Sequence, residues 1–144
     1  MLELDTDGTK QAEHFINAVG EDLSGRLIPA VEVRLRGLYR LLPPDYYEAA
    51  DNLADFCDRI EKQYGVRPVI YCTERTYKNI VASDSRFNKD KIWYESLFSK
   101  PDKDMDWTFW TYTNRVKFSF YESGEYLHMT VFNGSEDDFK KLIL

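Results

Sequence analysis

The chain has 144 residues, of which 15% are aromatic and 31% are charged, and its formal net charge is −6. The aromatic content argues against a disordered chain, and the acidic balance argues against a general nucleic-acid binder or a protein that binds anionic membranes. No apolar run approaches the roughly 20 residues of a membrane helix, no signal peptide is expected, and two cysteines are too few for a disulfide scaffold.

Apolar residues at helical spacing predict three helices in the first part of the chain, at 8–20, 45–64 and 74–82. Two strands separate them, at about 27–35 and 68–72. In the second half of the first strand, aliphatic and charged residues alternate strictly. Its aliphatic side chains Val31, Val33 and Leu35 therefore face one way, and Glu32 and Arg34 face the other.

Strands dominate the rest of the chain. They are predicted at 91–94, 106–113, 116–121 and 126–132, before a last helix at 136–143. The last two strands are expected to form a hairpin turned at Ser123–Gly124. Early alternation of strands and helices favours parallel pairing, whereas the tail is expected to be antiparallel. The predicted fold class is therefore α/β, in a chain well short of the about 250 residues of a full eight-stranded α/β barrel.

In parallel α/β folds, functional side chains lie at the C-terminal ends of strands and in the loops that follow. Glu32 and Arg34 meet this criterion and form either a substrate clamp or a structural ion pair. The structural interpretation is favoured, because buried charges are usually paired. Arg36 and Arg40 extend a basic cluster, but without a glycine-rich loop this cluster is interpreted as a solvated or salt-bridged edge.

Other candidates for chemistry are weaker. A nucleophilic thiol would require Cys72 and His128 to meet, and nothing in the sequence brings them together. Two histidines far apart in sequence argue against a zinc site, so neither a metal nor a cofactor is expected. The remaining polar residues near strand ends are Glu74, Tyr94, Glu95, Thr111, Thr113 and Thr130.

One strand carries aromatic side chains on both faces. Its aromatic residues are Trp107, Phe109, Trp110 and Tyr112. One face can pack in the core while the other lines a groove suited to the apolar faces of sugar rings. Core packing alone is the alternative explanation.

Six segments of the chain follow, in order, the pattern of one known family. They are QAEHFINAV (11–19), IPAVEV (28–33), GVRPVIYC (65–72), KIWY (91–94), DWTFWTYT (106–113) and LHMTVFNGSEDDFKKL (127–142). The chain resembles the C-terminal two-thirds of the family 25 glycoside hydrolases, muramidases that cleave peptidoglycan between N-acetylmuramic acid and N-acetylglucosamine. The resemblance implies an incomplete TIM-like β/α barrel without the family's first three strands. Residues 1–144 would then be a single, N-terminally truncated lysozyme-like domain.

The resemblance also places the family's catalytic positions. Its Asp-x-Glu motif matches Glu32 and Arg34, and the Asp and Asn of its closing-strand motif match His128 and Thr130. The glutamine of its aromatic strand matches Thr111. An arginine cannot protonate a leaving group, and its charge favours the ionised form of a neighbouring carboxylate. We therefore expect a degenerate muramidase-like domain that is catalytically impaired.

Three hypotheses for function follow. The leading one is binding of peptidoglycan, a related glycan or a protein partner, with a glycan contacted by Trp107, Phe109, Trp110, Thr111, Tyr112, Tyr94, Glu74 and Thr130. The second is an active muramidase with a displaced carboxylate such as Glu32, Glu74 or Glu95. The third is a structural fragment that forms a homodimer, or binds a partner, through an exposed barrel edge. The family resemblance suggests the cell wall or extracellular space.

Overall fold

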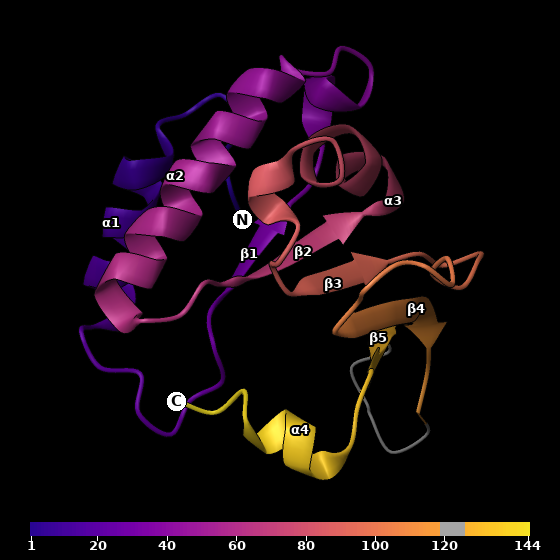
Figure 1. Ribbon diagram of the computed structural model, residues 1–144. Helices are drawn as coiled ribbons and strands as arrows, with labels where there is room; N and C mark the ends of the chain where they lie inside the picture. The colour runs from indigo at the N-terminus through magenta and orange to yellow at the C-terminus, as the bar shows by residue number, and fades with distance from the viewer. Residues whose placement is uncertain (119–125) are drawn as a thin grey trace.

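The computed structural model describes residues 1–118 and 126–144, which are built around a five-stranded sheet (Figure 1). The strands lie in the order of the chain: β1 (Ala30–Val33), β2 (Val69–Thr73), β3 (Ile92–Glu95), β4 (Phe109–Val116) and β5 (Leu127–Phe132). The first three pairings are parallel and the β4–β5 pairing is antiparallel. The predicted α/β class, parallel early and antiparallel late, is confirmed. Over the described residues, β1 and β5 do not pair, so the barrel is not closed.

Two long helices, α1 (Gly8–Val19) and α2 (Tyr46–Tyr64), lie side by side at the β1 end of the sheet (Figure 1). Both begin at an aspartate whose side chain accepts hydrogen bonds from backbone N–H groups of the first turn. α2 ends at Gly65, which adopts the left-handed conformation with φ of 74°. These local signals explain why the predicted bounds agree with the observed ones. None of the helices in the described ranges has the length and apolar character needed to cross a bilayer.

The shorter helices lie in the connections. They are η1 (Gly37–Arg40), α3 (Glu74–Thr76), η2 (Tyr77–Val81), η3 (Ser85–Phe87) and α4 (Glu136–Lys140). The helix predicted at 74–82 is therefore one α-helical turn followed by a π-helix. α4 is shorter than its prediction, because the chain after Lys140 turns to meet the segment before β1. There Ile143 forms an antiparallel bridge with Leu27.

Strand alternation divides the sheet into a core face and a polar face. The core face buries Val31 and Val33 of β1, Ile70 and Cys72 of β2, and Ile92 and Tyr94 of β3 together with α1 and α2. On the opposite face, the register aligns two rows of side chains across the strands. The first row is Glu32, Tyr71, Trp93, Phe109 and Phe132, and the second is Thr73, Glu95, Thr111 and Thr130.

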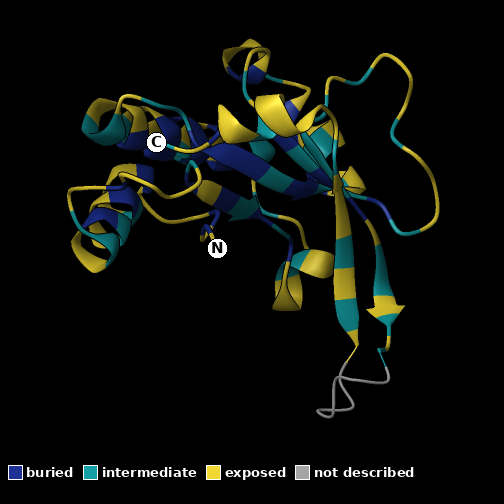
Figure 2. Cartoon of the chain, turned by 90° about the horizontal axis from the view of Figure 1, so that it is seen from below, coloured by how far each residue is buried: buried dark blue, intermediate teal, exposed yellow. Residues whose placement is uncertain are grey.

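β4 and β5 extend away from the buried part of the molecule and carry mainly half-buried and exposed residues (Figure 2). Up to residue 118, where the first described range ends, the strands predicted at 106–113 and 116–121 are not two separate elements. β4 instead continues to Val116 through register shifts at Thr113, because its partner β5 remains paired along this length. The rest of the predicted second strand, with the turn at Ser123–Gly124, lies outside the described residues.

Candidate functional site

Arg34 is the centre of an ion-pair network on the polar face. It follows β1 directly, and its Nε lies 2.8 Å from Oε1 of Glu32. Its Nη2 donates a 2.6 Å hydrogen bond to Oε2 of Glu95, the last residue of β3. The hydroxyl of Tyr71 accepts from the same Nη2 at 3.0 Å and donates to Glu95. Parallel strands end at a common edge of the sheet, which is why residues 61 positions apart in sequence meet here.

The electrostatics of this network hold Arg34 charged and Tyr71 neutral. Burial alone lowers the pKa of the guanidinium, but the hydrogen bond to Glu95 and the charges of Glu95 and Glu32 outweigh it, so the pKa of Arg34 is raised. Burial and the hydrogen bond to Glu95 raise the pKa of the Tyr71 hydroxyl. Both glutamates are therefore ion-pair partners of a permanent cation.

Two adjoining hollows open at the C-terminal ends of β1, β2 and β3. One, of about 420 Å³, is lined by Thr73, Glu74, Arg75, Lys78, Glu95, Ser96, Leu97 and Phe98. The other, of about 380 Å³, is lined by Arg34, Leu35, Arg40, Thr73, Arg75 and Glu95. Phe98 stands fully exposed at the rim of the first hollow. Together the hollows place an aromatic surface, two carboxylates and several guanidinium groups at one edge of the sheet.

The aromatic strand divides between the two faces of the sheet. Phe109 lies on the polar face, with ring centroids 5.2 Å from Trp93 and 5.4 Å from Phe132. Trp110 packs against the core, and its ring contacts Trp107 and Tyr112 at 6.2 and 5.7 Å. The structure therefore brings Phe109 to the polar face and leaves the other three aromatic candidates elsewhere.

The threonine candidates join the strands to one another. The indole Nε1 of Trp93 donates to Oγ1 of Thr111 at 2.9 Å, and this oxygen lies 2.8 Å from Oγ1 of Thr130. Thr111 is buried, whereas Thr130 is exposed. Of these two, Thr130 is the one that a ligand on the polar face can contact.

Three further candidates lie apart from the Arg34 network. Tyr94 is buried on the core face, edge-on to Tyr77. Glu74 is exposed at the rim of the first hollow, where it pairs with Lys78 at 2.6 Å. His128 is exposed in β5, two residues before Thr130 and so on the same face of that strand.

The structure excludes the thiol hypothesis. Cys72 is buried on the core face, whereas the His128 side chain is exposed on β5. Burial also raises the pKa of the Cys72 thiol, which disfavours the nucleophilic thiolate. In residues 1–118 and 126–144, no three His, Cys, Asp or Glu side chains converge as a metal site would require.

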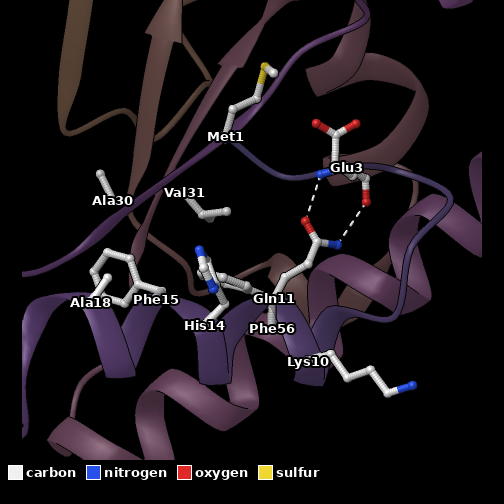
Figure 3. A pocket seen from close by; sticks show the side chains of 10 residues that line it. All are labelled: Met1, Glu3, Lys10, Gln11, His14, Phe15, Ala18, Ala30, Val31 and Phe56. Carbon is white, nitrogen blue, oxygen red and sulfur yellow. Dashed lines mark hydrogen bonds between the residues drawn. The ribbon is translucent and has the colours of Figure 1, made fainter.

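A larger hollow, of about 530 Å³, lies away from this network (Figure 3). It is formed between the N-terminal segment, α1 and the start of β1, and its apolar wall includes Phe15, Val31 and Phe56. The Gln11 side chain bridges to the backbone of Glu3 at its edge. None of the predicted site residues lines this hollow.

Sequence reasoning missed Tyr71 and Trp93 as residues of the polar face. The signal that could have found them is strand alternation: each stands between two buried residues of a short strand. Period-two geometry then places them on the same face as Glu32. Phe98 and Arg75 were also missed, because neither a loop residue such as Phe98 nor a residue of the three-residue helix α3 such as Arg75 carries a periodic signal.

Comparison with known proteins decides the family. Residues 2–119 match the glycosyl hydrolases family 25. The chain belongs to this family. None of the curated proteins compared with it matches.

Solved structures agree with this assignment. A family 25 glycosyl hydrolase from Bacillus anthracis is 28% identical with a TM-score of 0.83, and the match covers 99% of this chain and 65% of that one. The lysozyme from Streptomyces coelicolor (23% identity, TM-score 0.71) and the muramidase from Acremonium alcalophilum (21%, 0.71) share the fold, and each match covers 95% of this chain and 66% of theirs. The family 25 chain described here thus spans about two thirds of the length of these relatives.

Proposed function

We propose that residues 1–144 form one family 25 domain that binds peptidoglycan or a related glycan at the C-terminal edge of its sheet and does not cleave it. One observation carries the second part of this proposal: Arg34 engages both Glu32 and Glu95, at 2.8 and 2.6 Å. These are the carboxylates of the polar face nearest the strand ends. The first part rests on family membership and on the two hollows at this edge.

The chemistry of glycoside hydrolysis explains why Arg34 matters. Cleavage requires a protonated acid at the leaving oxygen and a second carboxylate, or a substrate amide held by one. Arg34 engages the carboxylates of both Glu32 and Glu95 in ion pairs, and its guanidinium stays charged and cannot itself donate the proton. Losing a positioned acid typically lowers the rate by roughly 10²–10⁴-fold. Glu74 supplies no substitute, because it is exposed and paired with Lys78.

The hollows retain features suited to binding. Ligand sites combine apolar surface with a few polar groups that fix orientation. Here Phe98 offers an exposed aromatic ring, and Thr73, Arg75 and Glu95 line both hollows. A sugar ring packed on Phe98 would place its hydroxyl groups within reach of these polar side chains.

The test is co-sedimentation of the chain with purified peptidoglycan, together with an assay for new reducing ends and an active muramidase as positive control. We expect sedimentation without new reducing ends. Phe98→Ala should weaken binding about threefold to tenfold, in line with the loss of one aromatic contact. Tyr47→Ala is the matched control, because Tyr47 is 86% exposed on α2 and lines neither hollow.

Three results would each contradict a part of the proposal. Reducing ends that disappear in Glu32→Gln or Glu95→Gln would show an active muramidase with a displaced carboxylate. If the chain does not sediment with peptidoglycan at low salt, the proposed glycan binding itself is wrong. If Phe98→Ala and Tyr47→Ala weaken peptidoglycan binding equally, the binding site lies outside these hollows.

A further inference from the structure

We infer that the connection between β1 and α2 docks on the surface of a lipid bilayer that carries anionic headgroups. This η1 connection (residues 34–45) contains the short helix η1 and lies beyond the C-terminal end of β1, at the top of the view in Figure 1. Two properties of its surface, apolar exposure and positive charge, point to this partner. Docking of this kind is independent of glycan binding, so it goes beyond the proposed function.

Three leucines of the η1 connection are turned to solvent. Leu38, Leu41 and Leu42 have exposed fractions of 66%, 82% and 64%, although they lie close together in the chain. Exposed leucines on protein surfaces are ordinarily scattered singly. Moving such side chains from water into the boundary between headgroups and acyl chains is favourable in proportion to the apolar area removed from water. The three leucines therefore form an apolar tip that suits a bilayer surface.

The backbone of the apolar tip is hydrogen-bonded internally. The N–H groups of Leu41 and Leu42 both donate to the carbonyl of Leu38, each at 2.9 Å. Peptide groups that are already paired cost less free energy to remove from water. The tip is followed by Pro43–Pro44, whose rings fix φ and restrict the conformations of the connection. The fold thus presents the leucines in a local structure that needs little rearrangement to enter the interface.

Positive charge surrounds the apolar tip, although the chain as a whole is acidic. Residues 34–44 contain three arginines and neither Asp nor Glu, whereas the formal net charge of the chain is −6. Arg34 and Arg36 pair with carboxylates of the sheet. Arg40 is exposed and forms no ion pair within the described parts of the chain. The acidic balance disfavours membrane binding through the surface as a whole, and the η1 connection is a local exception to it.

Arg75 of α3 adds a second guanidinium beside the tip. It donates through Nη1 to the carbonyl of Arg40 at 2.9 Å and, among residues 1–118 and 126–144, has no carboxylate partner. The acid next to it, Glu74, is paired with Lys78 at 2.6 Å, and Asp45 accepts from backbone N–H groups of α2. Guanidinium groups next to leucines match the two layers of an anionic bilayer, with phosphate groups outside and acyl chains beneath.

Co-sedimentation with vesicles tests this docking. The chain is mixed at low salt with vesicles of phosphatidylglycerol or of phosphatidylcholine, and the bound fraction is measured. We expect about tenfold to thirtyfold tighter binding to phosphatidylglycerol, as for two basic residues near an anionic surface. Added salt should reduce this preference by screening.

Variants assign the binding to the η1 connection. Leu41→Ala should weaken binding to phosphatidylglycerol about tenfold, and Arg40→Gln about fivefold. Both side chains are exposed, so neither change reaches the core. Leu27→Ala and Arg115→Gln are the matched controls, because both residues are exposed and lie outside this connection. They should bind as the wild-type chain does.

A fluorescent label reports whether the tip itself enters the bilayer. Both native cysteines are buried, so Leu41→Cys supplies a single exposed thiol for a polarity-sensitive dye. We expect the emission of the dye to shift to the blue when phosphatidylglycerol vesicles are added. The same dye on Leu27→Cys should not shift.

Three outcomes of the vesicle assays would overturn the inference: no binding to phosphatidylglycerol, equal binding to the two lipids, or wild-type binding by both Leu41→Ala and Arg40→Gln. A blue shift of the Leu41→Cys label that grows with protein concentration in the absence of vesicles would assign the tip to a contact between copies of the chain, and would also overturn it. None of these assays contains peptidoglycan, so failure here is distinguishable from failure of the proposed function.

Discussion

Arginine side chains organise this molecule at the residue scale. Arg67 pairs with three carboxylates: its Nε lies 2.6 Å from Asp90, and its Nη1 lies 2.5 Å from Asp58 and 3.2 Å from Glu61. The Asp90 side chain is 2% exposed, so this carboxylate depends on Arg67 for its counter-charge. Burial alone lowers the pKa of Arg67, but its hydrogen bonds to Asp90 and Asp58 outweigh burial and raise it.

Arg67→Met should lower the free energy of unfolding by about 3–5 kcal/mol, because it leaves a buried charge without a partner. Urea denaturation at pH 7 measures this loss. The control is Arg86→Met, since Arg86 pairs with exposed Asp51 and partly exposed Asp84 and should contribute less than about 1 kcal/mol. Similar losses in the two variants would show that Asp90 does not rely on Arg67.

At the scale of elements, the contact between α1 and α2 depends on Gly8. A Cβ atom at this position would lie 1.8 Å from the backbone oxygen of Asn52 and 3.0 Å from the backbone nitrogen of Phe56. Backbone atoms of a central helix cannot move aside as the end of a flexible side chain can. The start of α1 therefore approaches α2 as closely as a residue without a side chain allows.

Gly8→Ala should destabilise the chain by about 3 kcal/mol, because the added methyl group overpacks the junction and forces the helices apart. A lowered unfolding midpoint in thermal denaturation would report this effect. Thr9→Ala, at the neighbouring exposed position of α1, should leave the midpoint nearly unchanged. If Gly8→Ala is as stable as Thr9→Ala, the two helices are not in close contact at this point.

At the scale of the whole molecule, buried ionisable groups should set an alkaline limit to stability. Burial raises the pKa of the Cys57 thiol from 9.0 to about 12, and the pKa of Tyr94 from 10.0 to about 12. These groups lose their protons more readily in the unfolded chain than in the folded one. Their contribution is complete below about pH 9 and is lost as pH rises toward 12.

The unfolding midpoint should therefore fall steadily above pH 9, as followed by circular dichroism. Cys57→Ala should make this fall shallower, even though it lowers stability at neutral pH. A thiol reagent at pH 8 should label both cysteines slowly until denaturant is added, because both are buried. Rapid labelling of the folded chain, or a midpoint that does not change between pH 9 and 11, would contradict this prediction.

The sheet edge at β1 is only partly covered by the N-terminal segment, and this gives a prediction about association. Val69 donates to the carbonyl of Pro29, and the backbone N–H of Leu2 donates to the carbonyl of Glu32 on the other side of β1. By strand alternation, the N–H of Ala30 also faces this open side. Exposed edges invite pairing with another strand, so we expect a homodimer through β1.

Light scattering should give twice the mass of one chain at high concentration, and Ala30→Pro should remain monomeric because it removes an edge donor without disturbing β2. A wild-type monomer over a wide concentration range, with cooperative melting, would exclude this dimer. A dimer that persists in Ala30→Pro would place the interface elsewhere.

Local signals in the sequence determine much of this fold. Aspartate caps and Gly65 delimit α1 and α2, and period-two alternation places Glu32 and Arg34 on one face. These features can be predicted from the sequence because each depends on residues only a few positions apart. Long-range pairing decides the rest. Glu95 meets Arg34 across 61 positions only through the parallel register of β1, β2 and β3, and β4 extends to Val116 because β5 pairs with it. The same strands and helices, in the same order along the chain, could pair in many registers. The Arg34 network could therefore be identified only from the tertiary structure.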